Sequence, residues 1–224
     1  SELINDGVDG IVIIAPQIRG TKKISNVIGN FPAVLVENES SAALPSVNVD
    51  QLYGAYELTR HLILLGHKSI AHISGPKNWY ETSRRIKGYK QALTESKLGN
   101  SLIWEGDWSA RSGYESTKKI IKNKEITAIF AGNDTMALGA MKALSEAGLH
   151  VPRDISLVGF DDLPESEFLA PGLTTAKQDF LAVGDQALGI LLALINNSKV
   201  RMNVAIKPEI LIRTSTAKAK QVSE

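Results

Sequence analysis

The sequence predicts an α/β fold in which parallel sheets are flanked by helices. Apolar runs of strand length alternate with stretches in which apolar residues recur every three or four positions, and this alternation is typical of parallel sheets covered by helices. No segment rich in Pro, Gly and Ser divides the 224 residues. Two lobes would therefore require a chain that passes between them more than once. The composition, with 43% hydrophobic and 22% charged residues, is that of an ordinary globular protein.

The first predicted strand is the continuous apolar run from Gly10 to Pro16, which we expect to be buried on both faces of its sheet. Further strands are expected at residues 32–36, 46–49, 69–74, 101–105, 127–131, 155–160, 174–177 and 209–213. Helices are expected at residues 51–65, 83–96, 110–121, 135–147 and 181–195. Within the last of these helices, Gly184 and Gly189 predict close packing. Residues 217–224 are expected to form a disordered tail.

Composition and motifs exclude several classes of function. The formal net charge is +1, which gives no bulk electrostatic reason to bind nucleic acid or an anionic membrane. The chain has no cysteine, which excludes a disulfide scaffold, a thiolate zinc site, an iron–sulfur cluster and a cysteine nucleophile. The longest apolar run, residues 187–195, is well short of the ~20 residues that a membrane helix needs. The sequence lacks phosphate-loop, dinucleotide, serine-hydrolase and zinc-protease motifs, and its four histidines lack metal-ligand spacing, so we expect no cofactor, no metal and no enzyme activity.

Polar and aromatic residues gather where the predicted strands end. In open parallel sheets, ligands bind just beyond the carboxyl ends of the strands. The residues that follow these ends are Asp50, Trp79, Arg84, Arg85, Asp107, Trp108, Asn133, Asp134, Asp161 and Asp162. Such a set suits a neutral polyhydroxylated ligand, because carboxylates accept and guanidinium groups donate hydrogen bonds to hydroxyls, while an indole covers the C–H face of a sugar ring.

Several of these residues have a structural alternative. Asp134 is at least as well explained as the N-cap of the helix that follows it, and Ser109 is expected to be an N-cap as well. Trp79 is as consistent with packing on a surface as with a ligand contact. Asp161 and Asp162 are adjacent, and adjacent side chains tend to point apart, which argues against a catalytic pair.

A series of motifs follows in order along nearly the whole chain. They lie at residues 65–76, 85–89, 106–114, 133–141, 158–162 and 173–180, followed by Arg213–Thr216. Together they resemble the effector-binding core of the lactose/galactose repressor (LacI/GalR) family of bacterial transcription regulators. The Gly-Asp-Trp-Ser-Ala and Met-Ala-Leu-Gly-Ala-Met stretches are most similar to the lactose-repressor branch of that family.

The resemblance implies a two-lobed, periplasmic-binding-protein-like fold of type I, in which three crossovers join the lobes and the effector binds in the cleft between them. Residues 1–64 and 179–206 would form the N-terminal lobe, and residues 65–178 and 207–216 the C-terminal lobe. The effector contacts that the resemblance assigns are Asp50, Arg85, Trp108, Asn133, Asp161 and Phe180, with Trp79 as a further candidate. Ile14 stands where the lactose-repressor branch has a polar residue, so we expect the ligand to differ at that edge.

The resemblance further implies a sugar-sensing, homodimeric core of a cytoplasmic repressor, which binds operator DNA through an N-terminal helix-turn-helix headpiece. The headpiece and the first βαβ unit of the N-terminal lobe have no counterpart here, so we expect a core cut from a longer regulator that does not bind DNA specifically by itself. Dimer contacts are expected from residues 136–147 and from Phe168 and Leu169, unless the helix is buried on two sides within its lobe. No membrane partner is expected. The alternatives are a periplasmic sugar receptor of an ABC transporter and, more distantly, a glycosidase that uses Asp161 and Asp162.

Overall fold

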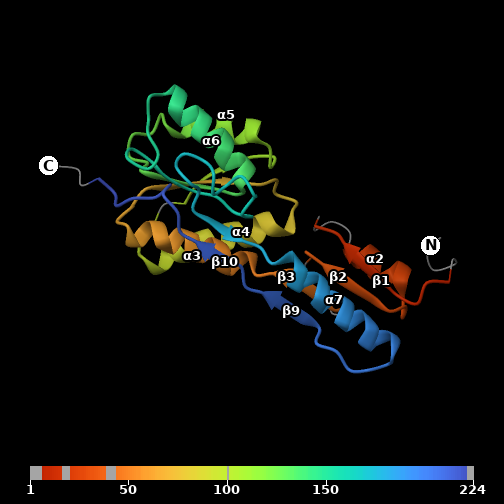
Figure 1. The fold of residues 1–224 in the computed structure, drawn as a ribbon. Helices are drawn as coiled ribbons and strands as arrows, with labels where there is room; N and C mark the ends of the chain where they lie inside the picture. Colours follow the sequence, from red (N-terminus) through yellow and green to blue (C-terminus); the bar gives the residue numbers. More distant parts are fainter. Residues whose placement is uncertain (1–6, 17–20, 39–43, 100, 221–224) are drawn as a thin grey trace. The chain divides into compact units, whose positions relative to one another are not determined.

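The computed structural model of the chain describes residues 7–16, 21–38, 44–99 and 101–220 (Figure 1). The chain divides into two compact units. Unit 1 consists of Ser1–Asp50, Asn78–Glu81 and Asp179–Lys207, and unit 2 consists of Gln51–Lys77, Thr82–Gln178 and Pro208–Glu224. Each unit has its own sheet and its own hydrophobic core. The predicted α/β fold with two lobes and repeated chain crossings is therefore present.

The sheet of unit 1 is parallel and has the strand order β1 (Ile11–Ile14), β2 (Ala33–Val36), β3 (Ser46–Val49) and β9 (Asn203–Ile206). Helix α7 (Phe180–Ile195) packs on one face, where its buried Val183, Ala187, Ile190 and Leu191 meet the valines of β2 and β3. On the other face, Ile24 and Ile28 of helix α2 (Thr21–Ile28) pack against Ala33 and Leu35. α2 and β9 are not among the elements predicted from the sequence.

Two expectations for unit 1 are wrong. Strand β1 is not buried on both faces, because it lies at an edge of the described sheet and pairs only with β2, which leaves Ile14 72% exposed. Gly184 and Gly189 do not mark close packing, since a Cβ added at either position would have no neighbour within 4 Å. Both glycines lie outside the face of α7 that is buried on the sheet.

The main sheet of unit 2 is parallel, with the order β5 (Leu102–Glu105), β4 (Ile70–Ser74), β6 (Ala128–Ala131) and β7 (Ser156–Val158). Isolated parallel bridges from Val158 and Asp161 continue the pairing to β8 (Thr175–Lys177) and its flanking residues. β8 in turn pairs with β10 (Glu209–Leu211). The β8–β10 pair is antiparallel, which corrects the expectation of parallel pairing throughout.

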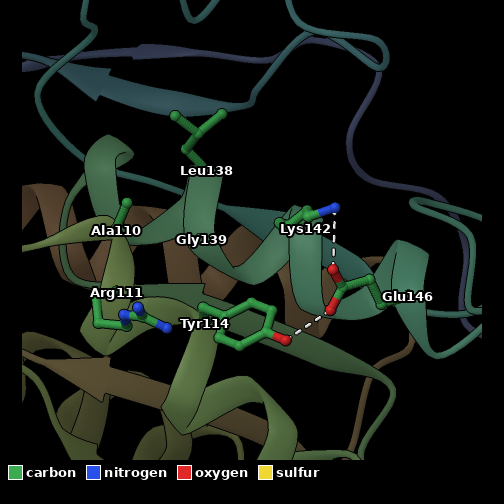
Figure 2. A pocket seen from close by; sticks show the side chains of 7 residues that line it. All are labelled: Ala110, Arg111, Tyr114, Leu138, Gly139, Lys142 and Glu146. Atoms are coloured by element: carbon green, nitrogen blue, oxygen red, sulfur yellow. Dashed lines mark hydrogen bonds and ion pairs between the residues drawn. The ribbon is translucent and has the colours of Figure 1, made fainter.

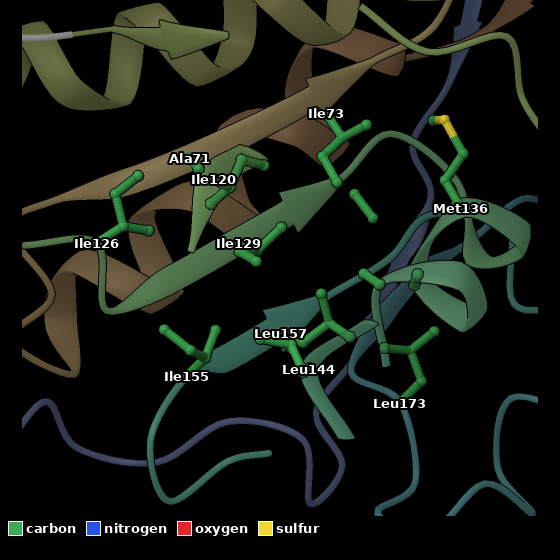
Figure 3. Close-up of a cluster of buried hydrophobic side chains, with 13 residues drawn as sticks. Ala71, Ile73, Ile120, Ile126, Ile129, Met136, Leu144, Ile155, Leu157 and Leu173 are labelled. Carbon is green, nitrogen blue, oxygen red and sulfur yellow. The ribbon is translucent and has the colours of Figure 1, made fainter. Parts of the chain in front are cut away.

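Helices cover both faces of the unit 2 sheet. Helices α5 (Ala110–Ile120) and α6 (Asp134–Glu146) enclose a core in which Met136 and Leu144 meet aliphatic side chains of β4, β6 and β7 (Figure 3). The opposite core contains side chains of α3 (Gln51–Leu64) and of α4 (Tyr80–Glu95) against Phe130 and Phe160. Residues 51–64, expected in the N-terminal lobe, thus cluster with unit 2, because Leu58 of α3 is fully buried in this core.

The segment that follows β10 is held along unit 2. Leu157 donates its backbone N–H to the Ser215 carbonyl, at 2.9 Å, and Ala219 donates to the Leu65 carbonyl, at 2.8 Å. His67, which is 3% exposed, contacts the Ala217 carbonyl at 3.0 Å. Residues 217–220 are therefore bound rather than a disordered tail, while the rest of the expected tail lies outside the described residues. Among the described residues, no helix is long and apolar enough to cross a membrane.

Candidate functional site

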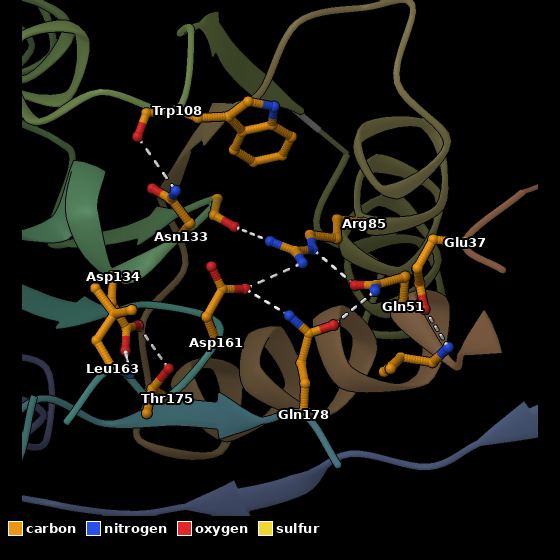
Figure 4. Close-up of polar contacts among 12 residues, drawn as sticks. Glu37, Gln51, Arg85, Trp108, Asn133, Asp134, Asp161, Leu163, Thr175 and Gln178 are labelled. Carbon is orange, nitrogen blue, oxygen red and sulfur yellow. Dashed lines mark hydrogen bonds and ion pairs between the residues drawn. The ribbon is translucent and has the colours of Figure 1, made fainter. Parts of the chain in front are cut away.

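Four of the seven candidate ligand contacts come together at one end of the unit 2 sheet (Figure 4). Trp108, Asn133 and Asp161 follow the carboxyl ends of β5, β6 and β7, and Arg85 extends toward them from α4. The parallel order of these strands places their ends at one edge, which is why residues far apart in the sequence share a site. The prediction that strand ends gather polar groups holds for unit 2.

Arg85 is the centre of this cluster. Its side chain is only 4% exposed. Nε donates to Oε1 of Gln51 at 2.9 Å, Nη1 donates to the Gly132 carbonyl, and Nη2 donates to Oδ1 of Asp161 at 3.2 Å. The guanidinium carbon lies 3.7 Å from the ring centroid of Phe160, which adds a cation–π contact. Three hydrogen bonds and an aromatic face hold this buried cation in one orientation.

Asp161 supplies the opposing charge. It has a φ of 114°, a left-handed conformation rare for a residue with a side chain, and its backbone N–H donates to the Ala176 carbonyl at 2.9 Å. Oδ1 also accepts a hydrogen bond from Nε2 of Gln178 at 2.8 Å. Burial raises the pKa of Asp161 to about 6, although Arg85 and Gln178 act in the opposite direction by stabilising the carboxylate.

Trp108 provides an aromatic wall whose position depends on a glycine. Its φ is 72°, and a Cβ added at Gly75 would overlap the indole ring. The ring therefore packs directly on the backbone of Gly75, just after β4, and its centroid lies 5.5 Å from the Arg85 guanidinium carbon. A backbone without a side chain at residue 75 is thus required for this placement.

The N-cap of α6 is Asn133, not Asp134. Asn133 is the N-cap of α6, where Oδ1 accepts from the Met136 N–H at 2.8 Å, and its Nδ2 donates to the Trp108 carbonyl at 3.2 Å. Asp134, considered as the cap, is instead 2% exposed and accepts hydrogen bonds from Ser166, Thr175 and Leu163. The cap lies one residue earlier than expected, which turns the Asp134 carboxylate inward.

Two other sequence expectations are confirmed in this region. Ser109 is the N-cap of α5, because its side chain accepts a hydrogen bond from Ser112 N–H. The adjacent carboxylates point to different cations: Asp161 pairs with Arg85, and Asp162 pairs with Arg213 at 2.7 Å. Each carboxylate is thus engaged in its own ion pair, in agreement with the expectation that the two side chains point apart.

The remaining candidates belong to unit 1. Asp50 follows β3 and donates its N–H to the Ile206 carbonyl of β9, at 2.7 Å. Phe180, the first residue of α7, is 58% exposed, and Trp79 is half-buried. Ile14, the position that departs from the lactose-repressor branch, is an exposed residue at the end of β1.

Gln51 and Gln178 were not among the residues predicted from the sequence, although Gln51 contacts Arg85 and Gln178 contacts Asp161. Gln51 is the first residue of α3 and is 1% exposed, and Gln178 directly follows β8. The rule that found the other residues, polar side chains just beyond strand ends, also applies to these two.

Two of the four histidines, His67 and His72, are buried in unit 2. His67 bridges Thr127 and Ser156 at 2.8 and 3.0 Å. His72 is buried against Phe130, and burial lowers the pKa of His72 to about 4. In the part of the chain that the structure describes, no group of His, Cys, Asp and Glu residues could hold a metal ion.

Two α/β units with parallel sheets, one of them with a polar and aromatic rim at its strand ends, are typical of the periplasmic-binding-protein-like fold. A family model described as "Periplasmic binding protein-like domain" matches residues 59–216, and the chain belongs to this family. The HTH-type transcriptional repressor PurR of Haemophilus influenzae (strain PittEE) is 36% identical over 218 residues, which cover 93% of this chain and 64% of that protein. The chain thus spans slightly less than two thirds of that relative.

The chain is also similar to solved structures of LacI-family regulators. The lac repressor dimer bound to operator and the anti-inducer ONPF has a TM-score of 0.90 and 32% identity, and the match covers 96% of this chain and 76% of that one. A LacI family regulator from Enterococcus faecium with bound ribose has a TM-score of 0.86 and 28% identity, covering 98% and 83% of the two chains. The predicted relationship to LacI/GalR regulators is confirmed, and these relatives are regulators rather than transport receptors.

Proposed function

We propose that the chain is the effector-binding core of a bacterial LacI-type transcriptional repressor, and that its effector is a neutral sugar. The observation that carries the proposal is the buried Arg85–Asp161 pair beside the Trp108 ring. The two charges cancel. An anionic or cationic ligand would have to displace one partner and leave the other buried without its counter-charge, which is costly.

The groups left for a ligand match adjacent hydroxyls. Arg85 uses three of the five N–H groups of a guanidinium in the contacts above, and no described residue donates to Oδ2 of Asp161. A hydroxyl that accepts from Arg85 and a neighbouring one that donates to Asp161 would satisfy both. The C–H face of the same ring would cover Trp108. Bound ribose in the Enterococcus faecium regulator is consistent with this class of ligand.

The test is a binding screen on the 224-residue chain with neutral sugars, including D-ribose, D-galactose and o-nitrophenyl galactoside, by thermal shift and then by titration calorimetry. Arg85→Met and Asp161→Asn should each weaken binding by about 2–4 kcal/mol, because each leaves a buried partner unsatisfied. Arg60→Met, a change of the same kind at an arginine of α3 whose side chain is 51% exposed and paired with Glu57, should bind as the parent does. Equal binding by the parent and the Arg85 and Asp161 variants would refute the site.

The proposal extends to unit 1. Asp50, Phe180 and Trp79 are assigned to the same ligand by the family resemblance, and the exposed ring of Phe180 supports a contact there. Phe180→Ala should weaken sugar binding about 5- to 150-fold, the equivalent of 1–3 kcal/mol. Leu181→Ala, at the neighbouring 77% exposed side chain, is the control. An unchanged affinity in Phe180→Ala would restrict the site to unit 2.

In the full-length regulator, the effector would act on operator binding through a helix-turn-helix headpiece, in the cytoplasm and without enzyme activity. A coupling of 1–3 kcal/mol would change operator affinity about 5- to 150-fold. The direction, induction or corepression, is read from a gel shift with the full-length protein in the presence and absence of the sugar. A sugar that binds but leaves operator affinity unchanged would refute the regulatory part of the proposal.

A homodimer is part of the proposal. Leu138 on α6 and Phe168 in the loop before β8 are 49% and 80% exposed, although both are large and apolar. Leu138 borders a shallow pocket of about 460 Å³ between α5 and α6, which Tyr114 and Lys142 also line (Figure 2). Met136 and Leu144 of the same helix are fully buried, so α6 uses one face for the core and presents another. An isologous contact across this face would cover the exposed side chains.

A further inference from the structure

Four side chains of unit 2 form a closed circuit of hydrogen bonds (Figure 4). Gln51 accepts from Arg85 Nε at 2.9 Å and donates from its own Nε2 to Oε1 of Gln178 at 2.8 Å. Gln178 donates from Nε2 to Oδ1 of Asp161 at 2.8 Å, and the same oxygen accepts from Arg85 Nη2 at 3.2 Å. Each member thus contacts two others.

The orientation of both amides in this circuit is determined by the two charged groups. A guanidinium can only donate, so Gln51 must turn its oxygen to Arg85 and its nitrogen to Gln178. A carboxylate can only accept, so Gln178 must turn its nitrogen to Asp161. The amide–amide hydrogen bond between the two glutamines satisfies both requirements together. Reversing either amide would place two donors or two acceptors against each other.

We propose that Gln51 and Gln178 are positioning residues of the ligand site, which hold Arg85 and Asp161 in the arrangement that leaves two guanidinium N–H groups and one carboxylate oxygen for the ligand. The assignment of that ligand as an effector rests on the proposed function. Without the glutamines, the guanidinium can turn its free N–H groups to Oδ2 of Asp161 and form a two-point pair. That pair would consume the groups that a sugar hydroxyl needs.

The two glutamines also lie where the chain crosses between the two units. Gln51 is the first residue of unit 2 after Asp50, and Gln178 is the last residue of unit 2 before Asp179. The chain therefore passes between the units next to both. Both glutamines are thus terminal residues of segments of unit 2.

The experiment is an NMR measurement on the ligand-free 224-residue chain with two readouts: solvent exchange of the Arg85 Nε–H, and the titration midpoint of the Asp161 carboxyl carbon. Gln51→Met, which keeps the side-chain length but removes both hydrogen bonds, should accelerate exchange at Arg85 Nε at least about tenfold, because the N–H loses its acceptor. Gln51→Glu retains the acceptor and should restore slow exchange. Gln178→Met should raise the Asp161 midpoint by about one pH unit, because it removes a donor to the carboxylate.

Gln91→Met is the matched control, since Gln91 is an exposed residue of α4 whose amide binds only Glu95 in the described structure, at 2.9 Å. It should change neither readout. Gln178 is only half-buried, so its variant is informative even where Gln51→Met fails to fold. Parent-like values of both readouts in Gln51→Met and Gln178→Met would show that the glutamines merely fill space, and would overturn the proposal. Because neither readout involves a ligand, failure of sugars to bind would refute the proposed function and leave these results unaffected.

Discussion

Asp161→Asn is expected to remove a specific pH dependence from the stability of the chain. In the folded chain, burial raises the pKa of Asp161 from 3.8 to about 6. Between these two values the folded chain binds a proton at Asp161 that the unfolded chain does not. The free energy of unfolding therefore falls as the pH rises through this window, by about 1.4 kcal/mol per pH unit. The Asn variant has no proton to bind and lacks this contribution.

The size of the effect follows from the same values. The full difference between a pKa of 3.8 and one of about 6 corresponds to about 3 kcal/mol. This is an upper bound, because the side chain is 27% exposed and solvent screens part of the effect. The wild type should therefore gain stability relative to Asp161→Asn as the pH is lowered from about 7 to about 4, by up to about 3 kcal/mol.

The assay is urea unfolding of both proteins at a series of pH values, followed by far-UV circular dichroism. Asp154→Asn is a control of opposite sign. Arg153 and Lys220, at 3.0 and 2.6 Å, lower the pKa of Asp154 from 3.8, so the wild type should keep a constant difference from this variant above about pH 4 and lose stability relative to it as the pH falls further. A difference between wild type and Asp161→Asn that stays constant from about pH 7 to about pH 4 would refute the raised pKa, and with it the burial argument.

The other predictions concern binding and assembly. Trp108→Ala should weaken sugar binding by about 1–3 kcal/mol in calorimetry while lowering stability less, and an unchanged affinity would exclude ring stacking. Gly75→Ala should weaken binding in the same assay and alter the near-UV circular dichroism of the tryptophans, because the added Cβ overlaps the indole of Trp108; a parent-like spectrum would contradict this packing. Leu138→Asp and Phe168→Asp should each shift the sedimentation of the chain from dimer to monomer, and a parent that already sediments as a monomer would remove the proposed interface. The chain itself should give no sequence-specific, salt-sensitive gel shift.

The sequence predicts most strands and helices here because their hydrophobic patterns are strong and local. Helix α3 is expected at residues 51–65 and found at Gln51–Leu64, and β4 is expected at residues 69–74 and found at Ile70–Ser74. Strand β9 was not predicted because it lacks such a pattern. Its residues Asn203–Ile206 have no continuous buried run, and the strand pairs with β3, about 157 residues earlier in the chain. Such pairing depends on tertiary contacts that a local pattern does not contain.

Some residues of the candidate site can likewise be predicted from the sequence, and others cannot. Arg85, Trp108 and Asp161 carry charge or an aromatic ring, and their place after strand ends is enough to nominate them. The roles of Asn133 and Asp134 depend on which of two adjacent residues caps α6, and a shift by one residue exchanges a cap for a buried carboxylate. Gln51 and Gln178 matter only because their amides lie 2.8 Å apart and between two charges. No property of either residue alone predicts that contact.

Burial and charge together suggest how the site selects its ligand. With Asp161 ionised, the Arg85–Asp161 pair has no net charge, and a neutral ligand can use its free hydrogen-bonding groups without breaking it. Protonation of Asp161, whose pKa is about 6, leaves Arg85 as an uncompensated cation and turns Oδ2 from an acceptor into a potential donor. Below that pH the same residues then favour a ligand with negative charge and disfavour hydroxyls that must donate. On the proposed function, selectivity for neutral polyols would therefore depend on the ionised pair, and Gln178, by donating to the carboxylate, helps to keep the pair in that state.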